Sequence, residues 1–135
     1  MAVALLDTNI LVRHLVGDHS EQSPRVTAFL HRVEAGEVTV RTTELVVFET
    51  VFTLERHYQQ SKARIREVLL PLLELPGILL PGKRRLRRVF DRYVDLNLPF
   101  ADAYHTVLME HLKLTEIISF DRHFDRVPGI TRQEP

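Results

Sequence analysis

The stretch that opens the fold is Val3-Ala4-Leu5-Leu6-Asp7-Thr8-Asn9-Ile10-Leu11. Its first four residues form a short apolar run of the kind found in buried strands, and Asp7 ends that run. A helix is expected to follow from about Thr8 to Val16, with Gly17 as its stop signal. This opening predicts a fold in which short strands and longer helices alternate.

The rest of the chain continues the alternation. Aliphatic runs at 38–40, 78–80 and 117–120 predict further strands, and 129–131 is a candidate fifth strand. Expected helix starts are Ser23-Pro24 or a point nearer Ser20, Thr42 or Thr43, Ser61, the segment around Leu86, and Pro99. Continuous apolar strands separated by helices pair in parallel through crossover connections. We therefore expect an α/β fold, a three-layer α/β/α sandwich around a central, mostly parallel sheet of four to five strands.

Composition is typical of one globular domain over residues 1–135, with 44% hydrophobic and 27% charged residues. The chain has no cysteine, which excludes disulfides and thiolate metal sites. It shows no basic leader and no apolar run of about 20 residues, so we expect a soluble, cytoplasmic protein. The net charge of zero does not by itself indicate nucleic-acid binding.

Acidic residues occur where the predicted strands end. Asp7 closes the first strand and Asp121 closes the fourth. Ligand sites in open α/β sheets lie beyond the carboxyl ends of the strands, so both carboxylates are expected at one edge. For either residue alone, a turn or a helix cap is a sufficient structural explanation.

Glu49 lies within a predicted helix, on a face shared with Leu45, Val46 and Phe52. A carboxylate in an apolar stripe is costly unless its charge is compensated. A metal ion would compensate it, and so would a buried salt bridge to an arginine. Both interpretations remain open from the sequence.

Asp102 falls in the first turn of the helix that Pro99 opens. A negative charge there is favoured by the helix dipole, which explains the residue without any site. The same position would also direct a carboxylate off the end of the helix.

Four acids at one edge would repel one another, and a divalent cation would resolve that conflict. Oxygen ligands favour Mg²⁺ or Mn²⁺, one ion or two, over zinc, and no histidine pair has metalloprotease spacing. Such ions activate water and neutralise charge on a phosphodiester. No glycine-rich phosphate loop is present, which argues against P-loop chemistry.

Four segments together resemble the PIN domain, and most closely the VapC-type toxins of prokaryotic toxin–antitoxin pairs. They are Leu6-Asp7-Thr8-Asn9-Ile10-Leu11, Val46-Val47-Phe48-Glu49-Thr50-Val51, Phe100-Ala101-Asp102-Ala103 and Ile118-Ser119-Phe120-Asp121-Arg122-His123-Phe124. The similarity runs from Val3 to about Thr131, and it depends on the order and spacing of the segments.

The resemblance implies that Asp7, Glu49, Asp102 and Asp121 are the catalytic, metal-binding quartet. Asn9 and Ser119 would be polar residues beside it, with Ser119 where the toxin pattern often has threonine. The resemblance also implies a metal-dependent endoribonuclease acting on structured RNA, a homodimer, and a small antitoxin partner. Fold-level analogy does not fix the RNA that is cut.

Further residues near the motifs have two interpretations each. Asp125 is a fifth acid or part of a solvated face, and His105 contacts substrate or is an ordinary surface histidine. The basic run of Lys83, Arg84, Arg85, Arg87 and Arg88 binds phosphate or is the solvated face of a helix. Arg13 and Arg122 are separate candidates for phosphate contact.

Other functional classes account less well for these residues. A haloacid-dehalogenase-type phosphatase would need a second aspartate at position 9, where this chain has Asn9. A receiver domain would need adjacent acids before the first helix and a late lysine, and neither is evident. The remaining alternative is a catalytically inactive PIN-like module that binds RNA or a protein, which a metal titration of RNA cleavage would distinguish.

Overall fold

The first strand and helix form where the sequence predicts them. Strand β1 (Ala4–Leu5) leads into helix α1 (Thr8–Val16), and Asp7 caps the helix in an extended conformation. Gly17 ends α1 with φ at +71°, a conformation that glycine adopts without steric cost.

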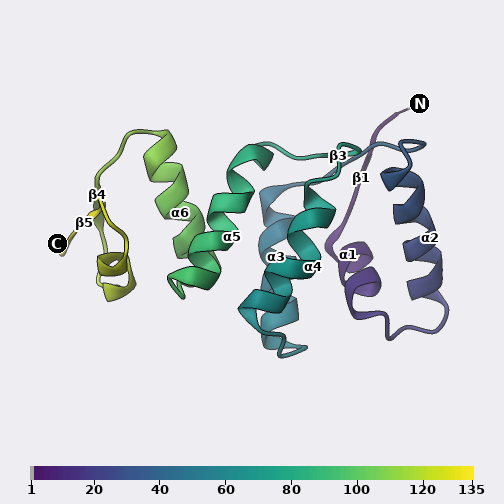
Figure 1. The fold of residues 1–135 in the computed structure, drawn as a ribbon, viewed down its shortest axis with the longest axis horizontal. Coiled ribbons are helices and arrows are strands. Elements are labelled where there is room, and N and C mark those ends of the chain that lie inside the picture. The colour runs from purple at the N-terminus through teal and green to yellow at the C-terminus, as the bar shows by residue number, and fades with distance from the viewer. Residues whose placement is uncertain (1) are drawn as a thin grey trace. The chain divides into compact units, whose positions relative to one another are not determined.

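The computed structural model describes residues 2–135, which form two compact units: the residues up to Lys83, and Arg84–Pro135. Figure 1 shows the elements in chain order from purple to yellow. After β1 and α1, the first unit contains α2 (Gln22–Glu34), β2 (Val40–Arg41), α3 (Glu44–Arg56), α4 (Lys62–Leu73) and β3 (Ile78–Leu79). The 3₁₀ turn η1 (Lys83–Arg85) leads into the second unit, which contains α5 (Leu86–Asp95), α6 (Phe100–His111), β4 (Glu116–Ile118), the 3₁₀ segment η2 (Arg122–Arg126) and β5 (Thr131–Gln133).

Every described strand pair is parallel. In the first unit the strand order is β1-β2-β3, with Val40 opposite both Ala4 and Ile78. In the second unit β4 pairs with β5, with Glu116 opposite Thr131. The predicted α/β class and parallel pairing are confirmed. The strands are two or three residues long, shorter than the apolar runs, because only these residues have ladder partners.

The core of the first unit lies on the central strand and on the helices around it. Val40 and Ile78 of the sheet are buried, and so are Leu11 of α1 and Leu54 of α3. Helix α1 packs against both α2 and α3, and α3 packs against α4. Each fully buried aliphatic side chain contributes about 1.5–3 kcal/mol, so these contacts hold the helices on the sheet.

Two of the predicted helix caps are confirmed, and for α2 the alternative of a start nearer Ser20 is confirmed, since the helix begins at Gln22 and is not capped by Ser23. Thr43 caps α3 and Ser61 caps α4, each through a side-chain oxygen. Ser23 lies inside α2 and is buried, and its hydroxyl donates to the Arg13 carbonyl at 2.8 Å. The residue therefore joins α2 to α1. Pro71 lies inside α4, which ends two residues beyond it.

An aromatic cluster sets the start of α6 against α5. The ring of Phe100 lies edge-on to Phe90 and Tyr93, with centroid distances of 5.0 and 5.3 Å. Phe90 and Tyr93 are fully buried. Aromatic pairs in this geometry add about 0.5–1.5 kcal/mol beyond the area they bury.

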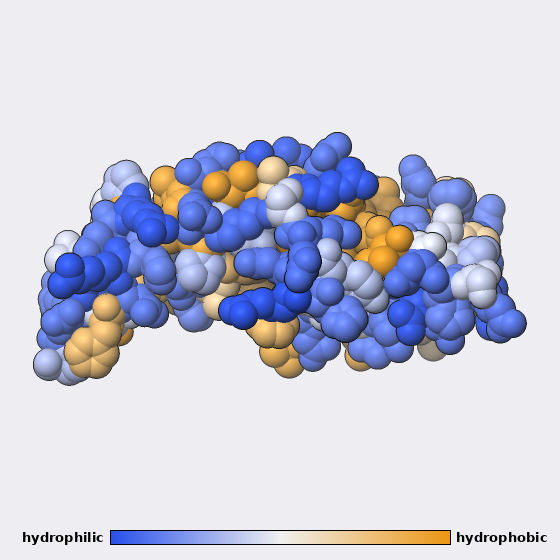
Figure 2. Space-filling view, turned by 90° about the horizontal axis from the view of Figure 1, so that it is seen from below, coloured by the Kyte–Doolittle hydropathy of each residue, from blue (hydrophilic) through white to orange (hydrophobic). Residues whose placement is uncertain are grey.

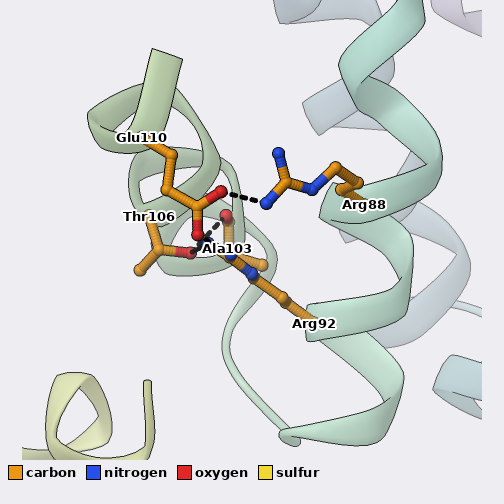
Figure 3. A network of polar contacts seen from close by, with 5 residues as sticks. All are labelled: Arg88, Arg92, Ala103, Thr106 and Glu110. Atoms are coloured by element: carbon orange, nitrogen blue, oxygen red, sulfur yellow. Dashed lines mark hydrogen bonds and ion pairs between the residues drawn. The ribbon is translucent and has the colours of Figure 1, made fainter. Parts of the chain in front are cut away.

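A polar network joins the same two helices (Figure 3). Arg88 and Arg92 of α5 both bind the carboxylate of Glu110 on α6. Arg92 Nη1 also donates to Thr106 Oγ1 at 3.0 Å, and that hydroxyl donates to the Ala103 carbonyl. Burial works against the charge of Glu110, but the hydrogen bonds and positive charges of Arg92 and Arg88 lower the pKa of its carboxyl.

Apolar side chains also reach the surface. Figure 2 shows orange hydrophobic areas on a mainly blue face. The large apolar residues that are exposed include Leu5, Leu45, Phe52, Ile118 and Phe120. No helix within residues 2–135 has both the length and the apolar character needed to cross a membrane.

Replacing Glu110 tests the network. Glu110→Gln is expected to lower the free energy of unfolding by roughly 1–2 kcal/mol at pH 7, because Arg92 loses a charged acceptor. The lowered pKa means that this stability is present above the ordinary value of 4.5 and is lost as the pH falls through the folded-state value. Urea unfolding at pH 7 and at pH 3 should therefore show a smaller difference between wild type and variant in acid.

Glu67→Gln is the matched control, because Glu67 is exposed and its ion pair with Arg64, at 3.6 Å, is exposed too. Equal losses in the two variants would contradict the role assigned to Glu110.

Candidate functional site

Two hydrogen bonds fix the point at which β1 ends. The Leu6 N–H donates to the Arg41 carbonyl at 2.7 Å, and Thr42 Oγ1 donates to the Leu6 carbonyl at 3.1 Å. Thr42 is fully buried, so losing this bond would leave a buried polar group without a partner. Asp7 is the next residue along the chain, and its backbone is therefore held at the carboxyl end of the strand.

In the first unit, a threonine connects two of the predicted site residues. Asp7 Oδ1 accepts a hydrogen bond from the Thr8 N–H at 2.8 Å. Thr8 Oγ1 donates to Glu49 Oε2, also at 2.8 Å. The start of α1 and the middle of α3 thus bring Asp7 and Glu49 to the same place, with Thr8 bonded to both carboxylates.

The surroundings of Glu49 differ from the sequence expectation. Glu49 is exposed, and on the same face Leu45 and Phe52 are 71% and 62% exposed. The prediction of an embedded, costly carboxylate is wrong, because this face of α3 is not covered in the first unit. Within the described part of the first unit Glu49 does not form a buried salt bridge either, and its described contact there is the hydrogen bond from Thr8.

In the second unit, Asp102 and Asp121 occupy element ends. Asp102 lies in the first turn of α6, whose start is fixed by the packing of Phe100. Asp121 precedes η2, and its N–H donates to Ser119 Oγ at 3.0 Å. The Ser119 N–H in turn donates to the Gln133 carbonyl, which ties this loop to β5.

The charge of Asp102 depends on that of Asp121. Burial raises the pKa of the Asp102 carboxyl, and the nearby negative charge of Asp121 raises it further, while His123 and His105 act in the opposite direction. A carboxylate whose pKa is raised by the charge of a second carboxylate lies close to it. The second unit therefore brings Asp102 and Asp121 together, as the first brings Asp7 and Glu49 together.

Each unit supplies a pair of acids. Across the described residues 2–135, no group of three or more histidine, aspartate or glutamate side chains is close enough to hold a metal ion. Within each pair, the oxygen ligands and the absence of cysteine suit a hard cation such as Mg²⁺ or Mn²⁺.

The structure assigns roles to several residues around the two pairs. Asn9 is exposed on α1 and lines a cavity. Asp125 forms an ion pair with Arg132 at 3.1 Å, which is a structural role. Sequence reasoning missed Thr8 and His123 as neighbours of the acids. The hydroxyl directly after Asp7 was the available signal for Thr8.

The basic run before and within α5 is not a single free surface. Lys83 Nζ donates to the Leu75 carbonyl at 2.5 Å, and burial lowers the pKa of its ammonium despite the opposing effect of Glu74. Arg88 is bound to Glu110. At least these two cations have structural partners, which favours the structural interpretation for part of the run.

A family model described as PIN domain matches residues 4–130. The match covers all four acids and extends across both units. It bears out the resemblance drawn from the four sequence segments, at the level of the family. Among curated proteins, none matches the chain.

Changing Asp121 tests the coupling in the second unit. Asp121→Asn is expected to lower the pKa of Asp102, because it removes the neighbouring negative charge while the effect of burial remains. Carbon-13 NMR titration of the Asp102 carboxyl measures this directly. An unchanged Asp102 titration would mean that the two carboxylates do not share an environment.

Proposed function

Because this chain belongs to the PIN-domain family, we propose that it is a metal-dependent endoribonuclease that hydrolyses phosphodiester bonds in structured RNA. PIN domains are generally nucleases, and the match over residues 4–130 is the observation that carries the proposal. We propose Asp7, Glu49, Asp102 and Asp121 as its catalytic residues and as the ligands of Mg²⁺ or Mn²⁺. The shared environments of Asp7 with Glu49 and of Asp102 with Asp121 support this assignment.

A hard divalent ion, when bound, supplies activation of a water molecule and neutralisation of phosphodiester charge. The residues of this chain would orient the ligands. Thr8 holds one oxygen of Glu49 and leaves the other free to bind, and the N–H of Thr8 holds one oxygen of Asp7. Ser119 fixes the backbone at Asp121, so its carboxylate extends from a defined point of the loop.

We also propose the finer identity that the sequence resemblance implies, a VapC-type toxin that forms a homodimer and is neutralised by a small antitoxin. The order and spacing of the four segments support the subtype. The exposed apolar side chains of Leu45 and Phe52 on α3 are consistent with a surface that another protein covers.

Metal dependence and the loss of one acid test the activity. The chain is expected to cleave RNA with Mg²⁺ or Mn²⁺ and to lose activity in EDTA. Asp7→Asn should lower kcat by roughly a hundredfold or more, since loss of a ligand exceeds the 10–100-fold effects of its supporting residues. Gel analysis of labelled transfer and ribosomal RNA fragments measures the rate.

Asp18→Asn is the control, because Asp18 is an exposed acid just beyond the end of α1. RNA binding without cleavage under any divalent ion would instead favour a catalytically inactive PIN-like module.

The hydrogen bond from Thr8 to Glu49 makes a separate prediction. Thr8→Val should lower kcat by about 10-fold or more, because Glu49 loses the hydroxyl that orients it. Thr8→Ser, which keeps the hydroxyl, should retain most of the activity. If Thr8→Ser is as impaired as Thr8→Val, the effect arises from packing and the positioning role is wrong. Initial rates at saturating RNA separate the two outcomes.

A further inference from the structure

A cavity of about 500 Å³ opens within the first unit, among β1, β2, α1 and α2. This volume falls within the range of about 300–1,000 Å³ that is typical of small-molecule sites. Helices α1 and α2 pack on each other (Figure 1). Residues of both helices line the cavity. Its lining belongs entirely to this unit.

One side of the cavity is apolar. Phe29 and Val26 line it from α2, and Ile10 lines it from α1. Phe29 is only half-buried, so its ring is accessible to a ligand. An accessible aromatic ring among aliphatic side chains suits a flat, weakly polar group, such as a nucleobase.

The rim of the cavity carries polar side chains, and a hydrogen bond orients two of them. Arg13 Nε donates to Gln22 Oε1 at 2.8 Å, which holds both side chains in place. The terminal nitrogens of Arg13 and the amide nitrogen of Gln22 have no partner in the described part of the chain. Asn9 adds a second exposed amide at the rim. Amide groups offer a donor and an acceptor together, which is the pattern that the edge of a base presents.

The charge of the rim is positive. Arg13 and Arg25 both line the cavity, and none of the described lining residues is acidic. Arg25 is exposed and makes no ion pair or hydrogen bond with residues 2–135. The occupant should therefore combine an apolar, planar part with negative charge.

We propose that this cavity is a nucleotide subsite, which takes one unstacked base of single-stranded RNA against Phe29 and the adjoining phosphate at Arg13 and Arg25. The inference rests on the proposed function, and it names how the substrate is recognised. Asn9 is two residues beyond Asp7 on α1, where each residue advances the helix by about 1.5 Å. A nucleotide bound in the cavity is therefore close, along the RNA strand, to any phosphodiester that Asp7 acts on.

An acidic amphipathic peptide is the other class of ligand with negative charge and apolar surface. It would use the arginines and the apolar wall, but it has no need of two amide side chains beside an accessible ring. The combination of Asn9, Gln22 and Phe29 favours the nucleotide, and the experiment below includes the peptide as a competing outcome.

Abasic scanning of an RNA ligand tests the subsite without requiring cleavage. The probe is an eight-nucleotide, fluorescein-labelled single-stranded RNA, together with versions that each lack one base. Fluorescence anisotropy measures their binding to the full chain in EDTA. Removal of the base that occupies the cavity should weaken binding by about fivefold or more, the effect of losing one base–aromatic stack.

The variants then assign that effect to the cavity. In Phe29→Leu the penalty for the missing base should disappear, because the stacking contact is already lost. Arg25→Gln should weaken binding of every probe and reduce the slope of log K against log salt by about one. Arg64→Gln, at an exposed arginine on α4, should match the wild type.

The subsite would be overturned if no position shows an abasic penalty, or if Phe29→Leu leaves the penalty unchanged. It would also be overturned if a synthetic acidic amphipathic helix binds the wild type and loses affinity in both cavity variants while the RNA does not.

A parallel cleavage assay separates this inference from the proposed function. RNA binding that depends on the cavity, without metal-dependent cleavage, would contradict the proposed nuclease activity and support the subsite. If Phe29→Leu and Arg25→Gln bind and cleave RNA normally, the subsite is contradicted and the proposed nuclease activity is supported.

Discussion

The buried hydrogen bond from Thr42 to the Leu6 carbonyl fixes the geometry from which the first unit follows. It holds the end of β1 beside β2 at a point where a free carbonyl would otherwise be buried without a partner. From that point Asp7 begins α1, Thr8 reaches Glu49 on α3, and Asn9 and Arg13 turn toward the cavity. The pair of Asp7 and Glu49 and the proposed RNA contact thus share one origin, since α1 and its cap Asp7 contribute to both, and Leu6, two residues before the helix, is bonded to β2 and to the residue after it.

Local sequence signals predicted the fold class well and the details of burial less well. Gly17, Thr43 and Ser61 act through the backbone next to them, so their effects can be read without tertiary information. The hydroxyl of Ser23 bonds to a carbonyl ten residues earlier, on another helix, and this depends on how the helices pack. The burial of Glu49 was predicted wrongly for a related reason. Its apolar neighbours share a helical face, but the periodicity of the sequence does not show whether another element covers that face.

The candidate site shows the same division between local and long-range information. Sequence position predicted that Asp7, Asp102 and Asp121 follow strands or begin helices, because those positions follow from the element pattern. The connection through Thr8 could not be predicted, since it spans 41 residues. The densest run of basic residues drew attention in the sequence, yet Lys83 and Arg88 have structural partners, whereas the better placed cations, Arg13 and Arg25, are twelve residues apart.

The packing of α5 on α6 has a consequence for how the second unit opens. Its aromatic cluster and the carboxylate of Glu110 bridge the same two helices, so neither helix can separate without breaking both sets of contacts. The neighbouring β4–β5 ladder is three residues long and has few such contacts, with Arg132 as its main polar link to η2. Amide hydrogens of α5 and α6 should therefore exchange with solvent as one cooperative foldon, and those of the ladder should exchange earlier and independently.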